Sequence, residues 1–202
     1  MEKLDFTKQY KSLYTPSARE AQIVEVPSFQ FLMLDGTGDP NTAAEYKAAV
    51  GALYKVAYTL KFAHKKTAGE DYAVAPLEGL WGMAAGLPYD PDRRDLWIWT
   101  MMIALPDFIS EAEVARAVEE AVRKTGDPTP TLIRLERFTE GRAAQIMHIG
   151  PYAAEAPTIQ RLHDDVARQG LALRGRHHEI YLSDPNRSAP EKMRTILRHP
   201  VE

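Results

Sequence analysis

The sequence predicts an α+β fold in which tandem strand-helix-strand-strand modules form one pseudo-two-fold antiparallel sheet. Helices are expected on one side of this sheet and a ligand cavity on the other. Three observations support the prediction: period-two strand patterns alternate with helical stripes, their order repeats, and neither half has enough apolar residues to fold alone. We expect an N-terminal arm over 1–22 and a single domain over 23–202, built from pseudo-repeats at about 23–106 and 130–202.

The first half of the chain begins with a polar arm over residues 1–22, which is expected to lie on the surface. The strands predicted after it are 29–34, 72–83 and 96–105. A long helix is predicted after the first strand, because Thr42 and Glu45 match a capping box and apolar residues recur at helical spacing to about Phe62. Glycine and proline at 86–91 predict the turn between the last two strands.

The second half contains two further predicted helices. Ser110 and Glu113 match a capping box at the start of one, and Gly126 ends it. Pro157 suits the first turn of the other, which ends at Gly170. The strands predicted here are 132–138 and 143–149, joined by a turn at 139–142, and then 173–182 and about 193–199.

Composition excludes several classes of function. The chain has 202 residues and no cysteine, which excludes disulfides, thiol nucleophiles and thiolate metal sites. Its 25 Lys plus Arg and 28 Asp plus Glu give a net charge of -3 and form no basic stripe, so nucleic-acid binding is not expected. There is no apolar leader and no run of roughly 18 apolar residues, so we expect a cytoplasmic protein without a membrane partner.

The segment 176–185 is the most informative, because it places Glu179 in a strand that otherwise reads as buried. Alternation puts Glu179 and Tyr181 on one face and Ile180 and Leu182 on the other. If the second face packs on a helix, Glu179 points into a cavity or to solvent on the opposite side. A carboxylate in a cavity is a candidate general base or a counter-charge for a cation. The alternative is a surface carboxylate paired with a nearby arginine.

Aromatic residues form the second candidate group. Trp97, Trp99 and Met101 share one face of a strand that is apolar on both faces. Together with Trp81 they could form flat walls for a planar aromatic ligand, or they could simply fill the core. Tyr152 follows a Gly-Pro pair at a strand-to-helix turn, where its ring either leans over a pocket or packs against the helix.

No metal or organic cofactor is expected. The adjacent His177 and His178 point to opposite faces of a strand and cannot easily bind one ion. Residues 35–39 contain two glycines but lack the third glycine and the lysine of a phosphate loop. No Gly-x-Ser-x-Gly segment is present, which argues against an α/β-hydrolase.

Four segments resemble the GyrI-like small-molecule-binding family: Leu13–Pro16, Pro76–Trp81, His148–Tyr152 and His177–Asp184. With the repeated element order, the resemblance covers nearly the whole chain. It implies a pocket in which a glutamate among aromatic residues receives lipophilic, often cationic compounds, and Glu179 stands at that position. No helix-turn-helix segment precedes the domain, which argues against transcriptional regulation in cis.

The resemblance also implies an activity, because similar stand-alone members include hydrolases that open the cyclopropane ring of DNA-alkylating cyclopropanoid antibiotics. In that case Glu179 is the general base, Tyr181 or Tyr152 donates to the developing negative charge, and Trp81 and Trp99 hold the ligand. The alternative is a non-catalytic module that sequesters lipophilic or cationic aromatic compounds. A gyrase-shielding role rests on the family name alone. The oligomeric state is left open.

Overall fold

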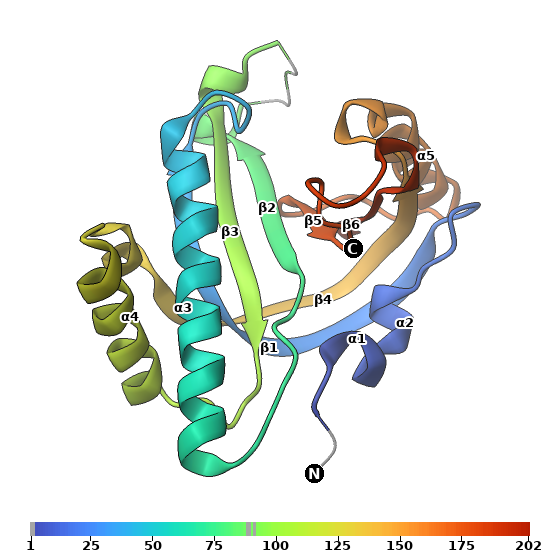
Figure 1. Ribbon diagram of the computed structural model, residues 1–202. Coiled ribbons are helices and arrows are strands. Elements are labelled where there is room, and N and C mark those ends of the chain that lie inside the picture. The colour runs from blue at the N-terminus through green and yellow to red at the C-terminus, as the bar shows by residue number, and fades with distance from the viewer. Residues whose placement is uncertain (1–2, 88–89, 91) are drawn as a thin grey trace. The chain divides into compact units, whose positions relative to one another are not determined.

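The computed structural model describes residues 3–87, 90 and 92–202. Within these residues six strands are hydrogen-bonded in the order β1-β3-β2-β5-β6-β4, with antiparallel pairs. Figure 1 labels the strands and helices. The strands are β1 Gln22–Thr37, β2 Leu77–Met83, β3 Trp97–Leu105, β4 Arg134–Ile149, β5 His177–Tyr181 and β6 Arg194–Pro200. The helices are α1 Phe6–Gln9, α2 Lys11–Tyr14, α3 Ala44–Ala68, α4 Glu111–Thr125 and α5 Ala156–Arg168.

The predicted α+β class and its repeated plan are confirmed by the order of these elements. The chain runs β1-α3-β2-β3 and later β4-α5-β5-β6, so the strand-helix-strand-strand plan occurs twice, with α4 in the connection. Short 3-10 turns complete the description at Ala84–Gly86, Arg94–Leu96, Thr129–Leu132, Tyr152–Ala154 and Pro190–Lys192.

The described chain separates into two compact units. Unit 1 comprises Met1–Gln9, Phe29–Ala75 and Trp81–Phe138, and unit 2 comprises Tyr10–Ser28, Pro76–Leu80 and Thr139–Glu202. Each unit has its own buried core.

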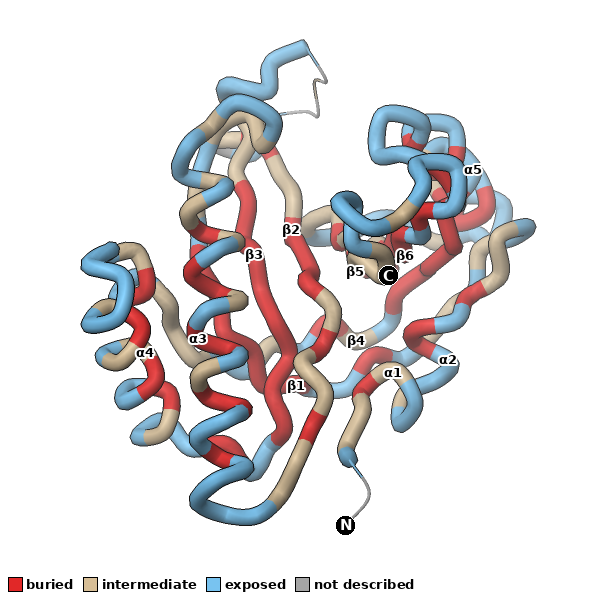
Figure 2. Tube along the Cα trace, in the orientation of Figure 1, coloured by how far each residue is buried: buried red, intermediate tan, exposed pale blue. Residues whose placement is uncertain are grey.

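Unit 1 is built on the pairing of β1 with β3. Their antiparallel register runs from Gln30 opposite Leu105 to Thr37 opposite Ile98. Helix α3 packs against β3 and α4. Apolar residues of the strands and of α3 are buried, as the red segments in Figure 2 show. The most completely covered include Leu32, Leu53, Leu60, Met101 and Ile103.

Unit 2 is built on β6, which pairs with β4 on one side and β5 on the other, antiparallel in both cases. Helix α5 packs on one face of these strands. The shared core cluster consists of Ala144, Ile146, Leu162, Val166, Leu197 and Val201. The α5 residues are Leu162 and Val166, four apart, as the helical period requires.

The two predicted capping boxes have different outcomes. The box at Ser110 is confirmed: its hydroxyl accepts a hydrogen bond from Glu113 N at 3.4 Å, and Glu113 Oε2 accepts one from Ser110 N at 2.9 Å. The box at Thr42 is wrong, because α3 begins one residue later than it requires. Its N-cap is Ala43, which has no side chain able to accept a hydrogen bond.

Strand lengths also differ from the prediction. The turn predicted at 139–142 is wrong, because β4 continues through it as one strand with Gly141 at a positive φ of 73°. β2 begins at Leu77, five residues later than expected. The turn predicted at 86–91 lies partly outside the described residues.

The N-terminal arm does not lie only on the surface, as the sequence suggested. In unit 1, Phe6 is buried and packs edge-on against Phe29, with ring centroids 5.6 Å apart. In unit 2, Leu13 and Tyr14 are buried as well. The isolated apolar residues of the arm are therefore anchors, which the polar composition around them concealed. Over residues 3–87, 90 and 92–202, no helix has both the length and the apolar character needed to cross a membrane.

Candidate functional site

Strand β5 carries Glu179 on the face of the sheet that α5 covers. Glu179 lies opposite Leu197 of β6, and Leu197 packs with Leu162 of α5. Directly opposed residues of paired strands share a face. The expectation that the helix packs behind Ile180 is therefore wrong for this strand: Ile180 is buried on the other face. Glu179 therefore lies on the same side of the sheet as α5.

The carboxylate of Glu179 is sheltered, with 15% of its side chain exposed. The Tyr181 hydroxyl donates a hydrogen bond of 2.7 Å to Glu179 Oε2. His177 Nε2 lies 3.3 Å from Oε1. The ring of Tyr152 packs edge-on against Tyr181, with centroids 5.6 Å apart, and remains 40% exposed. The structure thus brings together Glu179, Tyr181 and Tyr152, as the sequence suggested.

Glu155 is a member of this group that the sequence analysis missed. It is 5% exposed, it immediately precedes α5, and its Oε1 has no hydrogen-bond partner among the described residues. Burial raises the pKa of the Glu155 carboxyl to about 8, and the charge of Glu179 acts in the same direction, while Thr195 opposes it. At neutral pH Glu155 therefore holds its proton.

Two neighbouring carboxyl groups in different environments can divide the roles of acid and base. Glu155 is more buried than Glu179 and is held protonated by that burial and by the charge beside it. Glu179 is less buried and accepts a hydrogen bond of 2.7 Å from the Tyr181 hydroxyl. The two carboxyl groups therefore differ in burial and in their hydrogen-bond partners.

The sequence offered one signal for Glu155: a carboxylate placed two residues before Pro157, at a helix start. A glutamate there is usually explained by the helix dipole and by capping. In the structure Glu155 is the N-cap residue but its side chain makes no capping hydrogen bond. Only the fold reveals that it interacts with Glu179.

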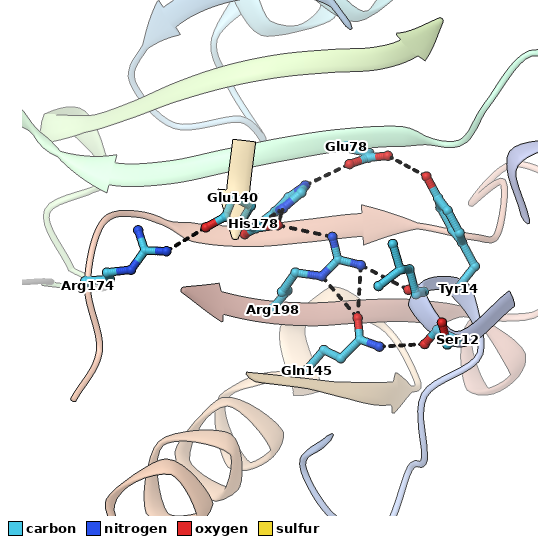
Figure 3. A network of polar contacts seen from close by, with 9 residues as sticks. Ser12, Tyr14, Glu78, Glu140, Gln145, Arg174, His178 and Arg198 are labelled. Atoms are coloured by element: carbon cyan, nitrogen blue, oxygen red, sulfur yellow. Dashed lines mark hydrogen bonds and ion pairs between the residues drawn. The ribbon is translucent and has the colours of Figure 1, made fainter. Parts of the chain in front are cut away.

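The opposite face of β5 holds a buried ionic network, drawn in Figure 3. His178 Nε2 is 2.9 Å from Glu78 Oε2, and His178 Nδ1 is 3.1 Å from Glu140. Arg198 Nη1 is 3.2 Å from the same Glu140 carboxylate. The Tyr14 hydroxyl donates to Glu78 at 3.2 Å. These side chains are almost fully buried, so the network ties β2, β4, β5 and β6 together inside unit 2.

Charge balance explains how this network tolerates burial. Burial disfavours the charged imidazolium of His178, but Glu140 and Glu78 outweigh it and raise its pKa to about 9. Burial likewise opposes the Glu140 carboxylate, yet His178 and Arg198 hold its pKa at about 2. The remaining donors of Arg198 bind Gln145 Oε1 and the Leu13 carbonyl. His178 and Glu78 therefore have a structural role, although both lie in the motifs that suggested the family.

The predicted aromatic walls belong to unit 1. Trp99 is 1% exposed and Met101 is fully buried, so both fill the core. Trp99 lies opposite Gly36 on β1, where a Cβ atom would overlap its ring, and the ring of Tyr46 from α3 packs edge-on against it at 5.2 Å. For these side chains the structure shows the packing role that the sequence left open.

Trp81 and Trp97 are only partly buried. Their rings make an edge-to-face contact with centroids 5.9 Å apart, and Tyr46 lies 6.0 Å from Trp81. The Trp97 indole donates a hydrogen bond of 3.1 Å to the Asp90 carbonyl, which fixes its orientation. These two indoles remain candidates for contact with a planar ligand.

Among the described residues, no group of three or more histidine, aspartate or glutamate side chains has the geometry to hold a metal ion. His177 and His178 point to opposite faces of β5: His177 lies near Glu179, and His178 lies within the buried network.

The chain is an α+β protein that combines a repeated strand-helix-strand-strand plan with a sheltered acid pair beside tyrosines. The chain belongs to the GyrI-like family: the GyrI-like small molecule binding domain matches residues 19–201. No match was found among curated proteins.

Several solved structures are similar over the whole chain. An uncharacterized conserved protein from Listeria innocua is 40% identical, with a TM-score of 0.92, covering 99% of this chain and 100% of the other. A hydrolase from Listeria innocua is 41% identical, with a TM-score of 0.87 and full coverage of both chains. The C-terminal domain of EcmrR is 12% identical, with a TM-score of 0.55 over 91% of this chain and 97% of the other, and shares the fold alone.

Proposed function

We propose that the protein is a cofactor-independent hydrolase that opens the strained ring of cyclopropanoid DNA-alkylating compounds and so detoxifies them in the cytoplasm. The observation that carries this proposal is the pair of carboxyl groups in unit 2, with Glu179 as the base and Glu155 as the acid. Support also comes from the 41% identical Listeria innocua protein, which is described as a hydrolase, and from the resemblance of the motifs to cyclopropanoid hydrolases.

The chemistry asks for one activated water. Glu179 takes a proton from the water as its oxygen attacks the ring carbon, and the broken ring bond sends its electron pair to the conjugated carbonyl. General-base catalysis of this kind contributes about 10² to 10⁴ in rate. Tyr181 orients the Glu179 carboxylate by its 2.7 Å hydrogen bond. Glu155 and Tyr152 are proposed to donate hydrogen bonds where negative charge develops.

In unit 1, Trp81 and Trp97 are proposed as a surface of their own for planar aromatic compounds, because their rings are partly exposed. Replacing either indole by leucine is expected to weaken the binding of such a compound to this surface. Trp99 and Met101 are assigned to packing.

The experiment is hydrolysis of a cyclopropanoid by the wild-type protein and by Glu179→Gln, followed by mass spectrometry of the ring-opened product. The variant keeps the shape of the side chain and removes the proton acceptor. We expect turnover to fall by about 10² or more while the unreacted compound still binds. Equal turnover by the variant would remove Glu179 from the mechanism.

A second candidate function is binding without reaction, in which the sheltered carboxylate of Glu179 acts as a counter-charge for a lipophilic cation. Here Glu179→Gln should weaken the binding of a quaternary ammonium or phosphonium probe and leave a neutral aromatic probe unaffected. Fluorescence titration of both probes, together with the absence of any product, would distinguish this function from hydrolysis.

A further inference from the structure

A row of histidines on the Glu179 face of unit 2 has no role in the function proposed above. His177 comes from β5, His199 from β6 and His163 from α5. The ring centroids of His177 and His199 are 5.9 Å apart, and those of His199 and His163 are 5.5 Å apart. His177 also extends the row to Glu179, since its Nε2 is 3.3 Å from Oε1.

Several ring nitrogens of this row are buried without a hydrogen bond. Among the described residues these are His163 Nε2, His199 Nδ1 and both ring nitrogens of His177, whose Nε2 has only its 3.3 Å contact with the Glu179 carboxylate. A buried polar atom without a partner is costly, so a purely packing role would be served better by apolar side chains. The buried His148 of β4 differs, because its Nδ1 lies 3.1 Å from the Thr158 hydroxyl.

The environment favours neutral imidazoles at His199 and His163. Burial lowers the pKa of His199 to about 4, the neighbouring His177 and His163 act in the same direction, and Glu140 opposes them. Burial and His177 also lower the pKa of His163, against Asp164. A neutral imidazole has one donor and one acceptor nitrogen, which is what a proton-carrying chain requires.

We infer that His177, His199 and His163 carry protons between Glu179 and solvent while a bound ligand covers the carboxylate. This inference rests on the proposed role of Glu179 as a general base. The row begins at the Glu179 carboxylate and ends at His163, which is partly exposed on α5. The His199 and His163 rings meet edge to face, at 82°, and the His177 and His199 rings are tilted by 50°, so the relay requires a bridging water molecule or a small rotation of the rings at each step.

The proton balance of the reaction shows why an exit is useful. The attacking water loses one proton to Glu179, its oxygen bonds to the ring carbon, and the ring C–C bond breaks. The released electron pair forms a phenolate, which takes a proton from solvent. Protonated Glu179 gives its proton to His177, and each ring accepts at one nitrogen as it donates from the other. The net reaction adds one water to the substrate, and Glu179 is restored.

The test compares steady-state hydrolysis of a cyclopropanoid by His177→Gln and His199→Gln with that of the wild type. Glutamine keeps a polar side chain but cannot accept and donate as an imidazole does. We expect kcat to fall about tenfold or more with KM unchanged, and added imidazole buffer to restore part of the rate. His148→Gln, outside the row, is the control and should keep the wild-type kcat.

An unchanged kcat in both variants would overturn the relay, and so would a loss that comes with a raised KM and no rescue by imidazole. Thermal denaturation shows whether the variants remain folded. The pattern also separates the two proposals. Inactive Glu179→Gln with fully active histidine variants rejects only the relay, whereas active Glu179→Gln rejects the base and the relay that depends on it.

A second measurement needs no substrate. Nitrogen NMR of the imidazole rings should find His199 neutral down to about pH 4, and His177→Gln should move its titration upward because a neighbouring ring has been removed. If His199 titrates near its ordinary 6.5 and does not respond to His177→Gln, the rings are not coupled and the relay is rejected.

Discussion

The two units share one plan of elements but place different side chains where a strand meets its helix. In unit 1, β3 presents Trp99 to Tyr46 of α3, and the face is closed by packed rings. In unit 2, β5 presents Glu179 on the face that α5 covers, beside the buried Glu155 at the start of that helix. The same backbone arrangement therefore holds packed aromatic rings in unit 1 and, beside an apolar core cluster, ionisable groups in unit 2.

This difference shows that individual side chains, and not the arrangement of the backbone, determine what each unit can bind or catalyse. A fold that accepts both kinds of face does not specify function, so function has to be argued from the side chains. In unit 2 the face of β5 opposite the acid pair holds a charge-balanced network of Glu78, Glu140, His178 and Arg198. In unit 1 the buried Lys61 and His64 pair with Asp71 and Glu113, whose side chains remain 24% and 20% exposed.

The largest effect on stability is expected from Glu140→Leu in unit 2. The substitution leaves His178 and Arg198 buried without their shared carboxylate, which costs about 3 to 5 kcal/mol for a buried pair. The control in unit 1 is Asp107→Asn, which breaks the exposed 2.8 Å pair with Arg137 and should cost less than about 1 kcal/mol. Urea denaturation measures both, and equal losses would mean that the network is not a distinguishing feature of unit 2.

In unit 1 the corresponding weak point is Gly36. An alanine Cβ there would overlap the Trp99 ring, so Gly36→Ala should destabilise by about 1 to 3 kcal/mol. The double variant Gly36→Ala with Trp99→Leu should lose less stability than the sum of the two single variants, because the smaller leucine removes the overlap. Gly51→Ala on α3 is the matched control: nothing lies near its Cβ, and helix propensity predicts a gain of about 0.5 to 1 kcal/mol. A neutral Gly36→Ala would show that this face is not tightly packed.

The pH dependence of stability should reveal Glu155. Its pKa of about 8 is above the ordinary 4.5, so the folded state binds the proton more tightly than the unfolded state. The contribution of Glu155 to the free energy of unfolding is therefore largest below pH 4.5, and it is lost as the pH rises to about 8.

In Glu155→Gln this contribution is absent, so the melting temperature of the variant should fall less over the same pH range than that of the wild type. Both proteins should still lose some stability between about pH 6.5 and 9, because the pKa of His178 in the folded state is raised to about 9. An identical dependence of melting temperature on pH in the two proteins would contradict the raised pKa of Glu155.

The smallest effects concern the helix starts of unit 1. Ser110→Ala removes a formed capping box and should cost about 1 kcal/mol. Thr42→Ala should change stability by less than about 0.5 kcal/mol, because its predicted box is not formed. A comparable loss at Thr42 in thermal denaturation would show that α3 is capped after all.

Much of the fold could be predicted because local patterns and tertiary structure agree. Helix α4 has its capping box at Ser110 and a left-handed Gly126 at its end, both readable from the sequence. The prediction was wrong at 139–142, where a glycine among three polar residues suggested a turn. Long-range contacts decide this segment: Arg174 binds the Glu140 carbonyl at 2.6 Å, and the Glu140 carboxylate is held by His178.

The candidate site could be predicted only in part. Glu179 was recognisable because a carboxylate is unusual in an apolar strand, and Tyr181 and Tyr152 do lie beside it. Glu155 was missed because its meaning comes from a residue 24 positions later in the chain, which local sequence does not reveal. The sequence could not distinguish a packing role for Trp99 from a ligand-binding role. The structure shows that the Trp99 ring packs directly against Gly36, a contact between distant positions in the chain.

The most direct test of the central claim is the pH dependence of cyclopropanoid hydrolysis by the wild type, Glu155→Gln and Glu179→Gln. Glu155 should lose its proton near pH 8, so the wild-type rate should fall as pH rises through that value. Glu155→Gln should remain active at higher pH, since its amide still donates, whereas Glu179→Gln should be inactive throughout. A wild-type rate that is unchanged through pH 9, with full activity of Glu179→Gln, would contradict the proposed division of acid and base.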